Sequence, residues 1–241
     1  MSSKSLRWIP DDKIRLNVDY ARQQFEFLER DFQTILEYVA LDESHLNVYS
    51  FRLADLMVRT GPEILRLFDL YLFNPNRSQI FHLRPESKKI LLNLQIKKDN
   101  RRDSFMDYLG AFPNFMSHGL NWAVEVKPLN KFVTPFATET RENNGRQINV
   151  VFWWEDGYNA LRHSLIEGFN ESATLGHALY SLAGLWLLHD FMDKDWGRVD
   201  LAKSDIFGKI TYISPDIQRV DYRRNSKTLS ERKKDGTRKK K

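Results

Sequence analysis

Hydrophobic residues recur at steps of three and four along the first forty positions of the chain. This spacing places one narrow apolar stripe on a helix, of the kind that packs against other helices of an antiparallel bundle. We therefore expect a long helix that begins after Pro10-Asp11-Asp12. The residues of the stripe are Ile14, Val18, Ala21, Phe25, Leu28, Phe32, Ile35 and Val39.

A second helical pattern runs from Phe51 to about Phe73. Ser50 is suited to cap its start, because a serine hydroxyl accepts a hydrogen bond from a backbone N–H of the first turn. Gly61-Pro62 lies inside the pattern. Proline has no N–H to donate and crowds the preceding turn, so we expect a kink or a brief break in the helix there.

Two more helices are expected after residue 150. The third begins near Trp153 and ends near Gly168, and the fourth runs from Ser172, another suitable N-cap, to about Met192. Alanine and leucine are so dense in the fourth helix that nearly all of its sides must be covered. A second subunit could supply part of that cover, since small residues would let another helix approach closely. These small residues are Gly176, Ala183 and Gly184.

Residues 77 to 149, between the second and third long helices, show no continuous helical pattern and no separate core. We expect short helices at 86–97 and 104–110, β-favouring stretches at 120–126 and 147–152, a turn at Asn143-Asn144-Gly145, and extended segments at 209–212 and 219–222. The predicted fold class is therefore mainly α. It is an up-and-down bundle of four to five helices with a mixed insertion, in a single domain over residues 1 to 222.

Composition excludes several classes of protein. With 41% apolar residues the chain can build a substantial core, and without cysteine it has no disulfide, thiolate zinc site or cysteine nucleophile. No glycine-rich phosphate loop or metalloprotease histidine pair is present, so we expect neither a cofactor nor a metal. No apolar run approaches the roughly 18 residues of a membrane span, and no signal segment is visible. We expect a cytoplasmic protein without a membrane partner.

The net charge of +5 is unevenly distributed. From Arg219 to Lys241 the chain has eleven Lys and Arg against three Asp and Glu, which leaves the rest mildly acidic. Residues 223–241 contain almost no apolar side chains, so we expect a disordered basic tail. Such a tail either attracts phosphates, with nucleic acid as the natural polyanion, or only keeps the protein soluble.

Polar and aromatic side chains are most concentrated in the run Trp153-Trp154-Glu155-Asp156-Gly157-Tyr158-Asn159-Ala160-Leu161-Arg162-His163. If this run is α-helical, residues four apart lie one above the other. Glu155, Asn159 and His163 then share one stripe. Trp154, Tyr158 and Arg162 form the adjoining stripe, so an imidazole, an amide and a guanidinium would lie in one patch.

The order of these elements resembles the HEPN superfamily of small helical-bundle proteins, over residues 12 to 73 and 150 to 192. The most specific part is Tyr158-Asn159-Ala160-Leu161-Arg162-His163. It is similar to that superfamily's motif of arginine, a polar residue, three variable positions and histidine. Asn159 and His163 match the motif, whereas Tyr158 stands in the arginine position.

The resemblance implies a function as well as a fold. Many HEPN proteins are metal-independent endoribonucleases of bacterial or archaeal defence and toxin–antitoxin systems, with the motifs of two subunits facing each other. Others have lost the catalytic residues and act as binding or assembly modules. The resemblance therefore implies a homodimer, with RNA and an antitoxin or nucleotidyltransferase as candidate partners.

Metal-free cleavage of RNA needs a group that removes the proton of the 2′-hydroxyl or protonates the leaving 5′-oxygen, and His163 would take that role. A cation must also offset the charge that grows on the phosphoryl oxygens, an effect worth roughly 2–4 kcal/mol. Arg162 is the candidate cation, and Asn159 would orient the imidazole or a phosphate oxygen. The candidate binding residues are Tyr158, Trp154 and Glu155, together with Arg223, Arg224, Lys233 and Lys234 of the tail.

Three interpretations follow from these residues. The favoured one is a HEPN-like module that binds RNA or a protein partner with reduced or absent catalysis, because Tyr158 replaces the charge-stabilising arginine. The second is a dimeric metal-independent endoribonuclease with His163 as general acid and base. The third is a plain helical scaffold, in which Trp153, Trp154 and Tyr158 are core residues and only the tail binds polyanions.

Overall fold

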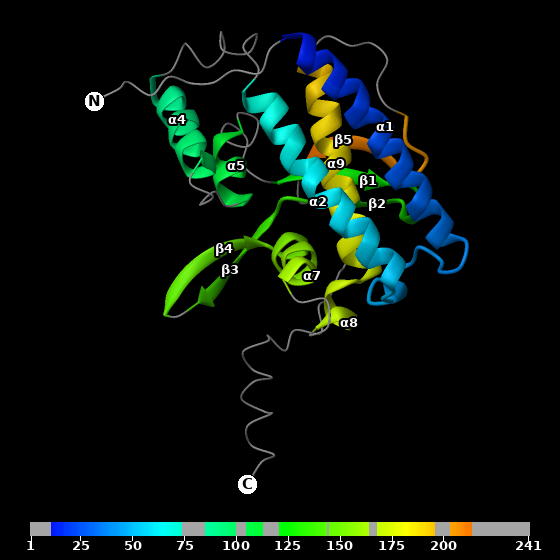
Figure 1. Ribbon diagram of the computed structural model, residues 1–241. Helices are drawn as coiled ribbons and strands as arrows, with labels where there is room; N and C mark the ends of the chain where they lie inside the picture. Colours follow the sequence, from blue (N-terminus) through cyan, green and yellow to red (C-terminus); the bar gives the residue numbers. More distant parts are fainter. Residues whose placement is uncertain are drawn as a thin grey trace.

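Three long helices lie side by side in the computed structural model of the protein (Figure 1). The structure describes residues 11–73, 85–99, 105–112, 121–143, 145–163, 168–195 and 203–213, with backbone alone for 11–16, 85–88, 99 and 195. The three helices are α1 (Asp11–Leu36), α2 (Phe51–Leu72) and α9 (Leu175–Asp195). Each contacts the other two, and their facing sides form the main part of the core. The prediction of a mainly helical fold is confirmed.

The first two helices follow their sequence patterns closely. Six residues of the predicted stripe are buried on one face of α1, namely Val18, Ala21, Phe25, Leu28, Phe32 and Ile35, whereas Val39 lies beyond the helix and is half-buried and the structure does not describe the side chain of Ile14. Ser50 caps α2 by accepting a hydrogen bond from the backbone N–H of Leu53 at 3.2 Å. The helix α2 continues through Pro62 without interruption, so the expected break is wrong. The glycine before this proline instead admits a ring from another helix, as described below.

The start of α9 differs from the prediction. Ser172 is the last residue of the short helix α8 (Phe169–Ser172), and α9 begins at Leu175. Thr174 takes the capping role, because its hydroxyl accepts a hydrogen bond from the backbone N–H of His177 at 3.2 Å. The cap of the fourth helix is thus Thr174, two residues after the predicted Ser172.

The cover of α9 comes from within one chain. Every residue from 175 to 192 is buried except Asp190. A Cβ at Gly184 would lie 3.0 Å from Cζ of Phe136, so this small residue admits a ring of the same chain. The dense apolar composition of α9 thus has an intramolecular explanation, and the homodimer stays a prediction.

Two small antiparallel sheets accompany the helices. In one, β1 (Trp122–Val126) lies between β2 (Lys131–Val133) and β5 (Phe207–Tyr212). In the other, β3 (Thr138–Asn143) and β4 (Arg146–Val151) form a hairpin that extends away from the long helices (Figure 1). The strands predicted at 120–126, 147–152 and 209–212 are confirmed as β1, β4 and β5, whereas β2 and β3 were not predicted.

The remaining predicted elements are the short helices and the hairpin turn. The helices α4 (Pro85–Asp99) and α5 (Phe105–Ala111) are both present, and Gly145 turns the hairpin with a φ of 75°, a conformation that suits glycine. The extended segment expected at 219–222 and the tail lie outside the described residues. Within the described ranges, no helix combines the length and apolar character needed to cross a membrane.

The last described segment, residues 203–213, joins β1 to α1. The hydroxyl of Ser204 donates to the carboxylate of Glu29, which also accepts the backbone N–H of Ile206 at 3.2 Å. Burial raises the pKa of Glu29, although these two hydrogen bonds oppose the rise. A buried carboxylate of α1 thus holds the segment that precedes β5.

Candidate functional site

The motif run begins as a π-helix rather than an α-helix. Residues Trp153–Asn159 form the π-helix η4, and Ala160–His163 form the α-helix α7. Hydrogen bonds in a π-helix join residues five apart, so its turns are wider than those of an α-helix. The two stripes require α-helical spacing over the whole run, but only Ala160–His163 has that spacing.

Two indole rings anchor η4 in the core. Trp153 is fully buried and donates its indole N–H to the carbonyl oxygen of Pro135. Trp154, a predicted binding residue, is 7% exposed and stacks on Phe105 of α5 with ring centroids 3.9 Å apart and an angle of 8° between the planes. Both rings fix the position of η4 against its neighbours.

Tyr158, which stands in the arginine position of the motif, is buried against α2. Its ring lies over Gly61, where a Cβ atom would overlap Cδ2 and Cε2 of the tyrosine. On its other side the ring contacts Trp154 with centroids 4.6 Å apart. A second close approach lies beside it, because a Cβ at Gly157 would overlap Cε of Met57. The motif position that a charge would occupy is therefore part of the core.

The polar side chains of the motif lie at the surface. Glu155 is exposed and Asn159 is half-buried, and the amide of Asn159 donates to the Glu155 carboxylate at 3.1 Å. Arg162 and His163 are exposed neighbours at the end of α7. Within the described chain, no hydrogen bond joins Asn159 to His163 and no carboxylate pairs with Arg162. An imidazole and a guanidinium thus face solvent together.

A second cation, which the sequence analysis did not single out, lies against η4. Arg141 of β3 forms two hydrogen bonds of 2.7 Å to the carboxylate of Asp156 and also contacts the carboxylate of Glu139. Burial lowers the pKa of Arg141, and the nearby charge of Glu155 opposes this effect. Arg141 is therefore bound by acidic side chains and is not available to replace the missing motif arginine.

His177 packs behind η4 in the interior. Its Nδ1 donates to the carbonyl oxygen of Ser172 at 3.0 Å, because a carbonyl can only accept. Burial lowers the pKa of His177 to about 4. Neither this residue nor any other described His, Asp or Glu belongs to a group of three that could hold a metal ion.

The candidate site therefore consists of Asn159, Arg162 and His163 at the surface, with Tyr158 and Trp154 beneath them. The predicted tail residues, which are Arg223, Arg224, Lys233 and Lys234, lie outside the described residues. Comparison of the chain with protein-family models, curated proteins and solved structures finds no significant match.

Proposed function

We propose that the protein is a HEPN-like helical-bundle module of a bacterial or archaeal defence or toxin–antitoxin system. It binds RNA or a protein partner with reduced or absent catalysis. The observation that carries this proposal is the exposed pair Arg162 and His163, at the end of a helix whose arginine position is filled by the buried ring of Tyr158.

Binding is supported by the charge and exposure of the pair. Arg162 has an exposed guanidinium and no carboxylate partner among the residues that the structure describes, and such a group attracts phosphate and releases counterions when it binds. A solvent-facing imidazole beside it can donate a hydrogen bond to the same group. The basic tail would add attraction that does not depend on base sequence.

The absence of turnover is supported by the loss of the motif cation. Loss of a group that stabilises charge in the transition state costs roughly 2–4 kcal/mol, which is about 30- to 1,000-fold in rate. Tyr158 supplies no positive charge. Arg141, the other guanidinium near η4, is already held by Asp156 and Glu139.

The test compares binding with cleavage. Purified full-length protein is titrated into labelled single-stranded and hairpin RNA in EDTA, and the same mixtures are followed by gel electrophoresis over hours. We expect binding that weakens with salt and at least fivefold with the double substitution Arg162→Gln and His163→Gln, and no cleavage product. If neither RNA nor a co-purifying partner requires these two residues, the proposal fails.

The alternative is a metal-independent endoribonuclease in which His163 acts as general acid and base. The exposed position of His163 favours it, because RNA can reach the imidazole. It requires Arg162 to supply the transition-state charge. EDTA-resistant cleavage that disappears with His163→Gln and is strongly reduced with Arg162→Gln would establish the alternative and refute the non-catalytic module.

The basic tail is tested separately. Deletion of residues 223–241 is expected to weaken RNA binding without abolishing it, since Arg162 and His163 remain. Complete loss of affinity on deletion would instead identify the helical part as a scaffold whose tail alone binds polyanions. Light scattering on the same samples tests the expected homodimer.

A further inference from the structure

Three aromatic side chains gather on the surface where α2 begins. The Phe51 ring is 80% exposed, and its centroid lies 4.4 Å from that of Phe169, with an angle of 33° between the planes. Tyr49 meets Phe169 edge-on with centroids 6.3 Å apart. Single exposed apolar residues are ordinary on protein surfaces, but here the half-buried ring of Phe169 contacts both exposed rings and joins them into one aromatic platform.

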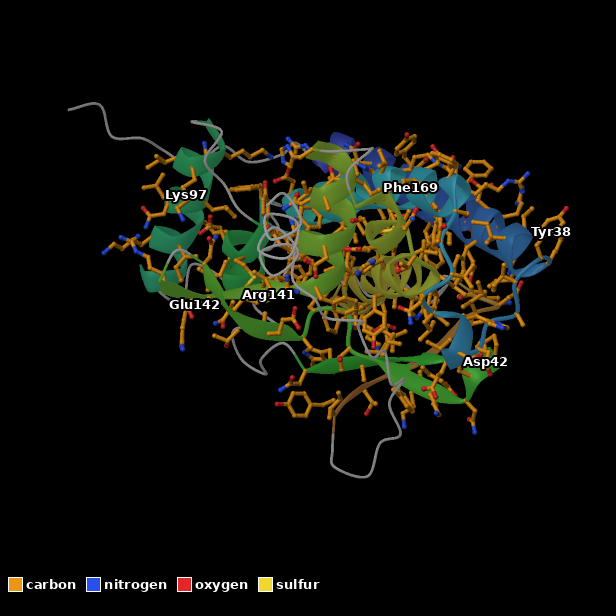
Figure 2. All side chains as sticks on the ribbon, turned by 90° about the horizontal axis from the view of Figure 1, so that it is seen from below. Tyr38, Asp42, Lys97, Arg141, Glu142 and Phe169 are labelled. Carbon is orange, nitrogen blue, oxygen red and sulfur yellow. The ribbon has the colours of Figure 1, made fainter. Side chains whose placement is uncertain are left out.

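This aromatic platform (Tyr49, Phe51 and Phe169) lies near α7, the helix that ends the motif run. Gly157 and Tyr158 pack on Met57 and Gly61 in the middle of α2, and α7 then contacts both α2 and α8. Phe169 is the first residue of α8. Figure 2 shows Phe169 over the helical layer, well apart from Arg141 on the hairpin and from Tyr38 beyond the end of α1.

We propose that the aromatic platform is a stacking site for an unpaired base of single-stranded RNA. This inference rests on the proposed function and adds to it the group of the RNA that is held and the rings that hold it. Stacking of a base on an aromatic ring is worth about 1–3 kcal/mol and tolerates any base, because every base has a π face.

Cations lie on the elements around the aromatic platform, together with the exposed carboxylate of Glu171 on α8. Arg52 follows Phe51 and is exposed, and Arg162 and His163 end the adjoining α7. Within the described chain, neither arginine has a carboxylate partner. A base on the rings would therefore place its own phosphates among cations, which is the combination that single-strand binding sites use.

The size of the apolar area argues against a protein partner as the occupant. A stable protein interface buries about 800 Å² on each side, more than three partly exposed rings provide. The next exposed positions along α2 include Asp55 and Arg59, and Arg59 is paired with both Asp55 and Asp31. Apart from Val58, which is 39% exposed, the apolar surface at the start of α2 thus meets charged side chains, as expected for a site that holds a base and its phosphates.

The experiment measures affinity for a fluorescein-labelled 12-nucleotide single-stranded RNA by fluorescence anisotropy, with the full-length protein at fixed salt. The variants are Phe51→Ala and Phe169→Ala. The matched control is Tyr38→Ala, because Tyr38 is 77% exposed, close to the 80% of Phe51, and lies far from the motif (Figure 2). We expect each of the two variants to raise the Kd at least fivefold, while Tyr38→Ala stays within twofold of the unmodified protein.

A second RNA of the same length without bases separates stacking from a general disturbance of the surface. The Phe51→Ala variant is expected to bind the abasic strand as well as the unmodified protein does, and Phe51→Trp is expected to restore affinity for the strand with bases. Equal losses on both strands would overturn the stacking site, because the ring would then act on the backbone or on the fold.

The outcomes also separate this inference from the proposed function. If the protein binds RNA and Phe51→Ala binds as tightly as Tyr38→Ala, the stacking site is refuted and RNA binding at the motif stands. If Phe51→Ala changes the molecular mass in light scattering and leaves RNA affinity unchanged, the platform is a contact between copies and the inference is refuted. If the unmodified protein binds no RNA, the stacking site is refuted, and the proposed module stands only if a co-purifying protein partner requires Arg162 and His163.

Discussion

Because Gly61 has no side chain, η4 can approach α2 closely. The ring of Tyr158 occupies the space in which any other residue would place its Cβ. Both the tyrosine in the arginine position and the glycine beneath it thus serve packing. The serine cap of α2 could be predicted from local chemistry, but the contact between residues 61 and 158 could not, because nothing near either residue indicates the other.

We expect Gly61→Ala to destabilise the protein by about 1–3 kcal/mol, because the added methyl group must displace the buried Tyr158 ring. The measurement is the free energy of unfolding in urea. Gly110→Ala is the matched control, since Gly110 also lies in a helix but has open space around its Cα, and there alanine should raise stability by about 0.5–1 kcal/mol. Equal effects at the two positions would contradict the packing role of Gly61.

The burial of His189 predicts that acid lowers the free energy of unfolding. Its ring is buried 5.6 Å from that of Phe25, and burial, with the charges of Arg22 and Arg66, lowers its pKa from 6.5 to about 3. Between these values the unfolded chain binds a proton that the folded chain does not. The buried neutral His189 therefore costs no stability above about pH 6.5, and below that pH it lowers stability by up to about 1.4 kcal/mol per pH unit.

We expect His189→Leu to reduce the dependence of unfolding free energy on pH between 6 and 4 by up to about 1.4 kcal/mol per pH unit, with the slope that His177 causes remaining. The control Phe191→Leu, on the same helix, should lower stability by a similar amount at every pH. A His189→Leu profile as steep as that of the unmodified protein would show that another group causes the acid sensitivity.

The long helices could be predicted because their apolar spacing is a local signal. The stripe of α1 and the cap of α2 each lie within a few turns of sequence, and both are present in the structure. The π-helix η4 carries no such signal. In its wide turn, Gly157 and Tyr158 both pack closely against α2. Because α2 lies about one hundred residues earlier in the chain, no local pattern could indicate these contacts.

The hairpin β3–β4 is held to η4 by Arg141. We expect Arg141→Ala to lower stability by about 1–2 kcal/mol, because Asp156 would lose two charge-assisted hydrogen bonds in a partly buried position. Hydrogen exchange of the hairpin amides should speed up more than exchange in α2. Arg146→Ala on β4 is the control, since Arg146 is exposed and has no carboxylate partner within the described chain, and a comparable effect there would rule out the docking role.

At the scale of the whole molecule, Ser204 joins the last described strand to the first helix. We expect Ser204→Ala to cost about 2–3 kcal/mol, because Glu29 loses a donor and the buried N–H of Phe207 loses its acceptor at 2.7 Å. The pKa of Glu29 is raised above 4.5, so the folded chain binds the proton of this carboxyl group more tightly than the unfolded chain does. The contribution of Glu29 to stability therefore falls as the pH rises from 4.5 to the pKa of the folded state.

The serine variant should steepen this fall, since loss of the hydroxyl removes a hydrogen bond that favours the charged carboxylate. Thermal unfolding at pH 4 to 8 measures the effect. Thr211→Val is the control, because it removes an exposed hydroxyl from β5 and keeps a β-branched side chain. A parallel shift at all pH values would show that Ser204 acts without involving the charge of Glu29.

The pairing of β1 with β5 joins residues that are about eighty-five positions apart. On the ribosome, β1 and the carboxylate of Glu29 emerge long before the segment that completes them is translated. Until then one edge of β1 is open to other nascent chains, a known route to aggregation. Slow translation between β1 and β5 would prolong this exposure, so the yield of folded protein should depend more on codon choice after residue 126 than before it.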